Sequence, residues 1–213
     1  MLQLPKTTEV GIRVPKEKLY ANCKLTMSQK RNIIDDILNI EWKNKLSCDT
    51  INIMPGKTFI EIEVFAVTLK SGKITDSHLK PIDESIPYPV VYIVHYDGKV
   101  QTWIAYKEKA KDGMLKTICF FHTDWQTEDD FTFDIQGITL DEVYENLIWQ
   151  IADTSEWKRE LTIRENIDRQ TQRDKLKKRI ATLESKMRRE KQFNLKVEMN
   201  AEIKRMKQEL KEI

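Results

Sequence analysis

The sequence predicts an α+β protein, in which a mostly antiparallel sheet with packed helices is followed by a C-terminal helical hairpin of the coiled-coil type. Two observations support this fold class. Before residue 158, segments rich in β-branched and aromatic residues are interspersed with helical patterns, and all the Gly, Pro, Trp and Tyr residues lie there. After it, apolar residues recur every three or four positions, which is the spacing of a helix that buries one stripe.

The net charge of the chain, +2, is a cancellation between its two parts. Residues 158–213 contain 18 basic and 10 acidic side chains, whereas residues 1–157 contain 18 basic and 24 acidic ones. The net charges are therefore +8 and −6. We predict a globular α+β body over residues 1–157 and a basic helical tail over residues 158–213.

Four elements are expected in the first quarter of the chain. Residues 1–20 are expected to be irregular, because Pro and Gly interrupt every period. Ser28 is the expected N-cap of a helix that continues to about Asn39 and has an isoleucine-rich stripe. A short strand is expected over residues 40–46, followed by an extended piece at residues 51–53.

The centre of the sequence shows the clearest strands. Residues 58–69 alternate between two faces, one of which contains Glu61 and Glu63. Residues 75–85 are expected to form a short helical turn. Residues 89–106 have the pattern of a β-hairpin, because Asp97-Gly98 is a favoured pair for a type I′ turn.

Two more elements complete the predicted body. Residues 116–122 form a further strand, rich in aromatic and β-branched side chains. Thr139 and Glu142 have the spacing of a capping box, which predicts a helix over residues 140–152.

The tail contains two short heptad segments, separated by a gap between Met187 and Met199. Asn194 lies in this gap, and Asn accepts the left-handed conformation at a helix end. We expect a hairpin that reverses near residues 191–196, with one long helix as the alternative. The apolar stripe requires a partner, which is the other arm, a second copy of the chain, or another protein. The expected partner-interface residues are Leu176, Ile180, Leu183, Met187, Phe193, Met199, Ile203, Met206 and Leu210.

Four residues are catalytic candidates. Glu61 and Glu63 project from one strand face, and paired carboxylates can bind Mg²⁺ in nucleases. Glu41 and Lys43 match the Glu-x-Lys element of a restriction-type nuclease. A solvated or salt-bridged strand face is the competing interpretation.

Other familiar chemistry is not indicated. The histidines (His78, His95 and His122) are scattered, which favours structural roles. Gly56-Lys57-Thr58 resembles the end of a phosphate-binding loop, but the first Gly is missing and a strand follows, so we reject nucleotide binding there.

The expected setting is cytoplasmic, with no cofactor, no metal and no membrane association. Three widely spaced cysteines argue against disulfides and zinc. The first 15 residues have no apolar region of the kind found in signal peptides, and no apolar run is long enough for a membrane span.

Basic side chains concentrate in the tail, where they are candidates for contacts with nucleic-acid phosphates. The alternative is a solvated coiled-coil face, because acidic residues are interspersed. The candidate nucleic-acid-binding residues are Arg173, Lys177, Lys178, Arg188, Arg189 and Lys191.

Several segments resemble a bacterial and archaeal family catalogued as domain of unknown function 4391. They are PKEKLYAN (15–22), IEWKNKLSCDTINI (40–53), IPYPVVYIVHYDGKVQTWIAYK (86–107), TDW (123–125) and REKQFNLKVEMNAEIKRMKQEL (189–210). The resemblance implies a single family unit. It also implies a setting beside helicases and DNA methyltransferases of restriction or phage-defence systems, and it assigns no catalytic residue.

We therefore expect an accessory, non-catalytic subunit of a DNA-targeting restriction-modification or phage-defence assembly. It would act through protein contacts, with a helicase or DNA methyltransferase as partner, and through nucleic acid. The alternatives are a Mg²⁺-dependent nuclease and a structural protein that forms homo-oligomers through its tail.

Overall fold

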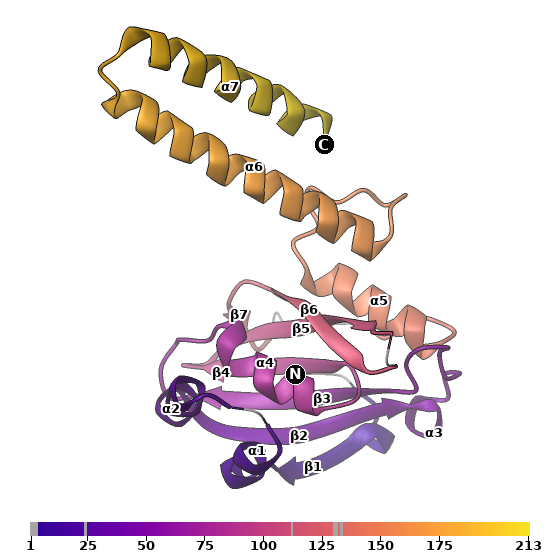
Figure 1. The fold of residues 1–213 in the computed structure, drawn as a ribbon. Helices are drawn as coiled ribbons and strands as arrows, with labels where there is room; N and C mark the ends of the chain where they lie inside the picture. The colour runs from indigo at the N-terminus through magenta and orange to yellow at the C-terminus, as the bar shows by residue number, and fades with distance from the viewer. Residues whose placement is uncertain (1–3, 24, 112, 130–131, 133) are drawn as a thin grey trace. The chain divides into compact units, whose positions relative to one another are not determined.

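The computed structural model describes residues 4–23, 25–111, 113–129, 132 and 134–213 (Figure 1). The chain forms two compact units, Met1–Thr154 and Ser155–Ile213. The first contains a mixed sheet with packed helices, and the second contains two contacting helices, so the predicted α+β class is confirmed. The boundary between the units lies close to the change in charge and composition after Trp157.

One sheet of seven strands forms in the described part of the first unit, and six of its strands lie side by side in chain order. Neighbouring strands are antiparallel except β3 and β4, which are parallel and are joined through helix α4, Asp76–Ser85. The short strand β7 pairs with β5. The strands are β1 Glu9–Arg13, β2 Ile37–Ser47, β3 Glu61–Leu69, β4 Val90–Tyr96, β5 Lys99–Lys109, β6 Leu115–His122 and β7 Gln126–Thr127.

The β4–β5 hairpin confirms the expected turn. Asp97 and Gly98 have φ angles of 49° and 69°, the left-handed conformation that a type I′ turn requires at both central positions. Because the turn sets the register, Val91 lies opposite Ile104 and Ile93 opposite Thr102 in the middle of the sheet.

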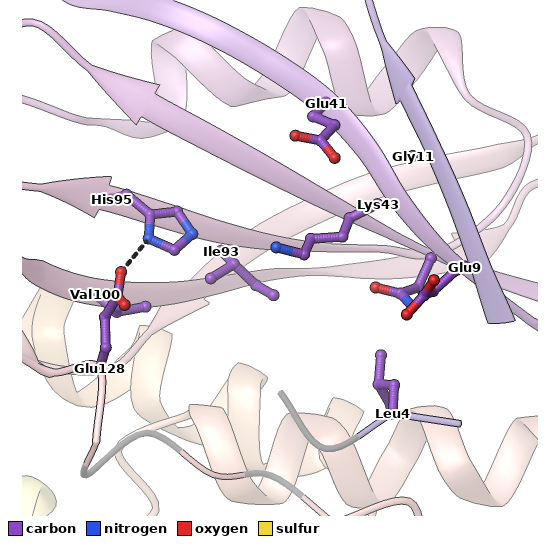
Figure 2. A pocket seen from close by; sticks show the side chains of 10 residues that line it. Leu4, Glu9, Gly11, Glu41, Lys43, Ile93, His95, Val100 and Glu128 are labelled. Atoms are coloured by element: carbon purple, nitrogen blue, oxygen red, sulfur yellow. Dashed lines mark hydrogen bonds and ion pairs between the residues drawn. The ribbon is translucent and has the colours of Figure 1, made fainter. Parts of the chain in front are cut away.

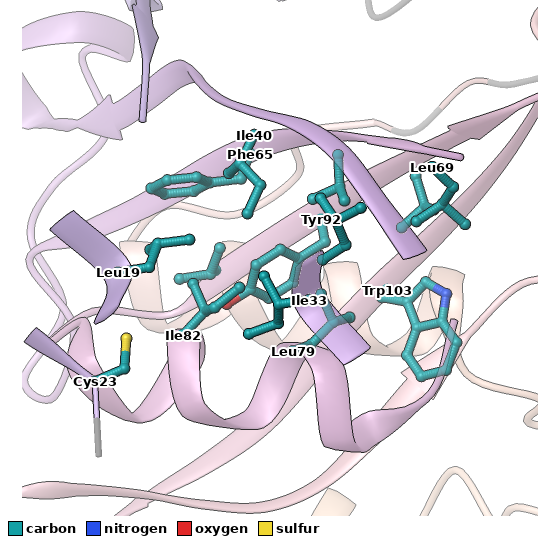
Figure 3. Close-up of a cluster of buried hydrophobic side chains, with 14 residues drawn as sticks. Leu19, Cys23, Ile33, Ile40, Phe65, Leu69, Leu79, Ile82, Tyr92 and Trp103 are labelled. Atoms are coloured by element: carbon teal, nitrogen blue, oxygen red, sulfur yellow. The ribbon is translucent and has the colours of Figure 1, made fainter. Parts of the chain in front are cut away.

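A hydrophobic cluster joins one face of the sheet to three helices (Figure 3). Leu19 of α1 (Lys16–Asn22), Ile33 of α2 (Met27–Asp36) and Leu79 of α4 pack against Phe65 and Tyr92 on the strands. The β3 side chains that point the other way, such as Ile62 and Val64, are also fully buried, so both faces of this strand are covered. Helix α5 (Leu140–Ile151) packs against β3 and β5.

The N-terminal region differs from its prediction. Residues 1–20 are not irregular, because the described part contains a 3₁₀ turn (Lys6–Thr8), strand β1 and helix α1. Among the described strands, β1 pairs with β2 alone. A φ of +64° at Gly11 accompanies an irregular register in this pair, so the residue pattern did not indicate a strand.

Helix α2 and the segment after β2 also require correction. Thr26, not Ser28, caps α2, because its side chain accepts the N–H of Gln29 in a capping box. The helix ends at Asp36, since Ile37 already pairs with Leu69 across β2 and β3. The predicted extended piece at residues 51–53 is wrong, because helix α3 (Cys48–Ile51) includes residue 51 and Asn52 follows it in the left-handed conformation, with a φ of 54°.

The second unit is a pair of helices, α6 (Ile163–Arg189) and α7 (Phe193–Glu212), joined by residues 190–192. They run antiparallel (Figure 1), which agrees with the predicted hairpin and excludes one long helix. None of the helices in the described part of the chain combines the length and apolar character needed to cross a membrane.

Candidate functional site

The apolar stripes of the tail pack against each other. Ile180 of α6 is buried together with Ile203 and Met206 of α7, and the flanking side chains of the cluster are Leu176, Leu183, Met187 and Leu210. The other arm, one of the three partners that the sequence left open, therefore covers part of the stripe. Met199 is half-buried, whereas Phe193 lies at the turn with 77% of its surface exposed.

Polar contacts fix the end of the hairpin that lies opposite the turn. The Asn166 side chain is 1% exposed and donates to the carbonyls of Lys158 and Leu161. Arg173 lies 3.0 Å from the carboxylate of Glu156, and its side chain is mostly buried. Arg173 is therefore a structural residue of this unit, and it is not exposed like the other basic candidates.

The remaining basic candidates lie on the exposed surface of the hairpin and are Lys177, Lys178, Arg188, Arg189 and Lys191. Residues 175–191 contain eight Lys and Arg side chains and two Glu. Both carboxylates are engaged. Glu184 lies 2.7 Å from the Lys207 amine, and Glu190 accepts the backbone N–H groups of Lys191 and Gln192.

These contacts lower the pKa of each carboxyl, through Lys207 for Glu184 and through the two backbone N–H groups for Glu190. The carboxylates therefore stay ionised, and they are turned toward partners within the hairpin. We call the exposed face carrying Lys177, Lys178, Arg188, Arg189 and Lys191 the basic face. Its charge favours an anionic partner.

The two strand carboxylates have different environments. Glu61 forms an ion pair with Lys45 at 2.5 Å. Glu63 is 4% exposed, and its Oε2 accepts the indole N–H of Trp42 at 2.6 Å. Burial raises the pKa of Glu63 to about 7, against the opposing effect of the Trp42 hydrogen bond. The salt-bridged strand face expected as the competing interpretation is present at Glu61, while Glu63 is enclosed.

Glu41 and Lys43 lie away from these carboxylates. Glu41 pairs with Ala66, whose side chain points to the face opposite that of Glu63. Glu41 and Lys43 line a cavity of about 390 Å³ on the Ala66 face of the sheet. Figure 2 shows the Lys43 side chain reaching across this cavity toward Ile93. The other lining residues are Leu4, Glu9, Gly11, Asn44, His95, Val100 and Glu128.

The structure does not bring the four catalytic candidates together. Within the described ranges, no group of three or more His, Cys, Asp or Glu side chains is placed to hold a metal ion.

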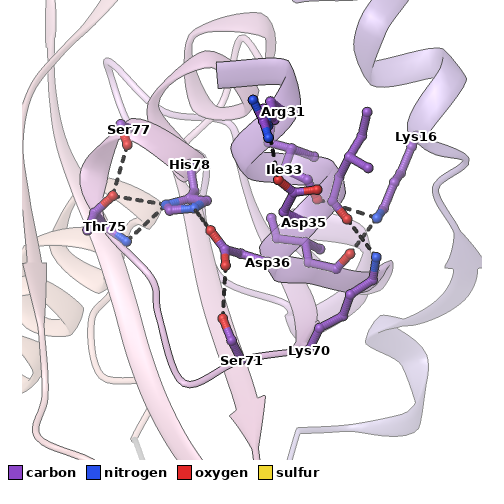
Figure 4. A network of polar contacts seen from close by, with 12 residues as sticks. Lys16, Arg31, Ile33, Asp35, Asp36, Lys70, Ser71, Thr75, Ser77 and His78 are labelled. Carbon is purple, nitrogen blue, oxygen red and sulfur yellow. Dashed lines mark hydrogen bonds and ion pairs between the residues drawn. The ribbon is translucent and has the colours of Figure 1, made fainter. Parts of the chain in front are cut away.

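The three histidines have hydrogen-bond partners. His78 is 1% exposed and lies between the Asp36 carboxylate, at 3.0 Å from Nε2, and Thr75, whose N–H donates to Nδ1 (Figure 4). This geometry makes Nε2 the donor to Asp36, and the hydrogen bond lowers the pKa of Asp36. His95 lies 3.1 Å from Glu128, and His122 lies 3.2 Å from the Gln101 amide.

The loop at Gly56-Lys57-Thr58, whose sequence resembles a phosphate-binding loop, binds a carboxylate side chain of the same chain. The backbone N–H groups of Lys57, Thr58 and Phe59 all donate to the carboxylate of Asp141, at 2.8 to 3.3 Å. A Cβ atom at Gly56 would lie 2.1 Å from the same carboxylate, so only Gly permits this approach. The N–H groups of this loop are therefore satisfied by a side chain of the protein itself.

Sequence reasoning missed a buried ion pair. The Lys107 amine lies 3.3 Å from the Asp83 carboxylate, and both side chains are almost fully buried. The amine also donates to the carbonyls of Asp83, Ile86 and Tyr88, and the Thr117 hydroxyl donates to Asp83. Burial raises the pKa of Asp83 and lowers the pKa of Lys107, while their attraction opposes both shifts. The position of Lys107 inside an apolar strand was the available signal.

Comparison with known proteins identifies a family without an assigned activity. A family model described as a domain of unknown function (DUF4391) matches residues 2–210. No curated protein and no solved structure matches the chain significantly.

Proposed function

The chain belongs to the DUF4391 family, and we propose that it is a non-catalytic accessory subunit of a DNA-targeting defence or restriction-modification assembly. In this proposal the α+β unit docks on a protein partner, such as a helicase or DNA methyltransferase. The basic face of the hairpin contacts DNA phosphates.

The observation that carries the proposal is the engagement of both acidic side chains of residues 175–191 within the hairpin. Of the eight basic side chains of that segment, Arg179 is paired with Glu202 at 2.8 Å, whereas the five side chains of the basic face lie on the exposed surface. Lys and Arg on such a surface gain affinity for DNA by releasing counterions from the phosphates. The apolar stripe is already buried between α6 and α7, so the exposed face is left for an external ligand.

The non-catalytic part of the proposal is supported by the placement of the strand residues. Glu61 and Glu63 lie on one sheet face, Glu41 and Lys43 line the cavity on the other, and Glu61 is neutralised by Lys45. Two-metal and one-metal nuclease chemistry needs carboxylates that converge on one point. This arrangement favours the accessory role over the nuclease alternative.

DNA binding by the full chain tests the proposal. Fluorescence anisotropy with a labelled duplex is expected to show affinity that falls steeply with salt. The variant Arg188→Gln/Arg189→Gln is expected to reduce the slope of log K against log salt by about 2, because each phosphate contact contributes about 0.9. The matched control, Lys204→Gln/Arg205→Gln, removes the same charge from exposed positions of α7. Equal losses in both variants, or no binding at low salt, would contradict the proposed basic face.

The protein partner requires a separate experiment. The purified chain is mixed with a candidate helicase and, separately, with a candidate DNA methyltransferase, and each mixture is analysed by size-exclusion chromatography. Co-elution with one of them is expected. Independent elution from both at micromolar concentration and low salt would reject the accessory role. Incubation of plasmid with Mg²⁺ or Mn²⁺, with Glu63→Ala alongside, tests the nuclease alternative.

A further inference from the structure

The turn of the hairpin combines an exposed aromatic ring with a concentration of positive charge. Phe193 is the first residue of α7 and is 77% exposed, and Val197, one turn later on the same side of the helix, is 52% exposed. Phe193 is also the only aromatic residue after Trp157. A large apolar ring at this exposure on a helix end does not contribute to the hairpin core, which consists of other residues.

The charge around the ring is almost entirely positive. Residues 186–197 contain five basic side chains and one acidic side chain. The acidic one, Glu190, directs its carboxylate to the backbone N–H groups of Lys191 and Gln192. The ring is therefore bordered in sequence by Arg188, Arg189 and Lys191, with no free carboxylate among them.

The exposed ring and the basic side chains beside it indicate which kind of ligand the turn can bind. A second copy of the same turn is disfavoured, because like charges would meet. A duplex offers phosphates but keeps its bases stacked, so the ring could reach a base face only at the cost of unstacking a base step. An unpaired strand offers phosphates to the cations and base faces to the ring, and base–aromatic stacking is a main source of affinity in single-strand recognition.

Resting on the proposed DNA contact, we propose that the hairpin turn binds DNA with unpaired bases, with the Phe193 ring stacked on one base. Arg188, Arg189 and Lys191 bind the phosphates that flank this base. The assembly would then engage DNA where the strands are separated, as they are beside a helicase or at a duplex end.

The test compares a blunt duplex with the same duplex carrying a single-stranded extension, using the full chain and fluorescence anisotropy. The extended DNA is expected to bind more tightly. Phe193→Ala is expected to weaken binding to the extended DNA by about 5- to 100-fold and to leave the blunt duplex unaffected. Phe193→Trp keeps an aromatic face and should preserve the preference. Val197→Ala removes exposed apolar surface without a ring and should have little effect. Circular dichroism checks that α7 remains helical.

Photocrosslinking provides a second readout. A strand with iodouracil in the unpaired segment is expected to crosslink at Phe193, which mass spectrometry of the peptides would identify. If both DNAs bind but Phe193→Ala weakens neither, or weakens them equally, the stacking proposal is wrong while the DNA contact stands. If neither DNA binds, the proposed function itself fails. If Phe193→Ala instead abolishes co-elution with a protein partner, the turn is a protein-docking site, and the proposal is overturned.

Discussion

Glu63 is expected to make the stability of the α+β unit fall as the pH rises. Its pKa is about 7 in the folded protein, compared with an ordinary value of 4.5. Between these two pH values the native state holds a proton that the unfolded state has lost. The stabilisation by the protonated form is therefore complete below about pH 4.5 and is lost as the pH rises through about 7.

The expected size of the effect follows from the two pKa values. They differ by about 2.5 pH units, and each unit corresponds to about 1.36 kcal/mol, so the loss approaches about 3 kcal/mol. Glu63→Gln stays neutral at every pH, and its amide oxygen can still accept the Trp42 indole N–H. The variant should therefore be more stable than the wild type at alkaline pH by up to this amount, and the difference should shrink toward acidic pH.

Urea unfolding at several pH values measures the difference. Tryptophan fluorescence is the appropriate probe, because four of the five Trp residues lie in Met1–Thr154. Trp42→Phe removes a donor that favours the ionised carboxylate, so it should make the loss of stability with pH larger. A free-energy difference between wild type and Glu63→Gln that does not change with pH would refute the reasoning.

Three further predictions concern stability. Lys107→Met should lower the free energy of unfolding by about 3–5 kcal/mol, because it leaves the buried Asp83 unpaired. The double variant Lys107→Met/Asp83→Leu should lose less than the sum of the two single losses. Full additivity of these losses in urea unfolding would contradict an interaction between the two side chains. Asp141→Ala should cost about 1–3 kcal/mol and speed amide exchange in the loop before β3, because three N–H groups lose their acceptor; unchanged exchange would argue against this contact. Ile203→Ala should destabilise the hairpin by about 2–5 kcal/mol by circular dichroism, whereas Phe193→Ala should not, and equal losses would place Phe193 in the core.

The strongest sequence patterns predicted the fold well. The Asp97-Gly98 pair and the alternation over residues 58–69 correspond to the β4–β5 turn and to strand β3. The heptads correspond to the contact between α6 and α7. In each case many neighbouring residues favour the same structure, so local physics and tertiary packing agree.

The missed features depend on tertiary contacts. Strand β1 is short, mostly exposed and paired on one side only, so it has little apolar pattern. The parallel pairing of β3 and β4 goes with the helical connection through α4, and the expectation of only a short helical turn at residues 75–85 did not indicate this crossover. The candidate site shows the same limit, because the sequence analysis included Arg173 among the basic contacts, whereas its ion pair with Glu156 depends on the fold of the second unit.

The contact of the Asp141 carboxylate also has a consequence for folding during synthesis. Its three N–H partners precede β3, more than eighty residues earlier in the chain, and Met54 bridges Thr139 next to it. During synthesis on the ribosome, the loop before β3 therefore has no acceptor for these N–H groups until Asp141 has emerged. The α+β unit can complete its fold only when α5 leaves the exit tunnel, and the basic hairpin is synthesised after α5.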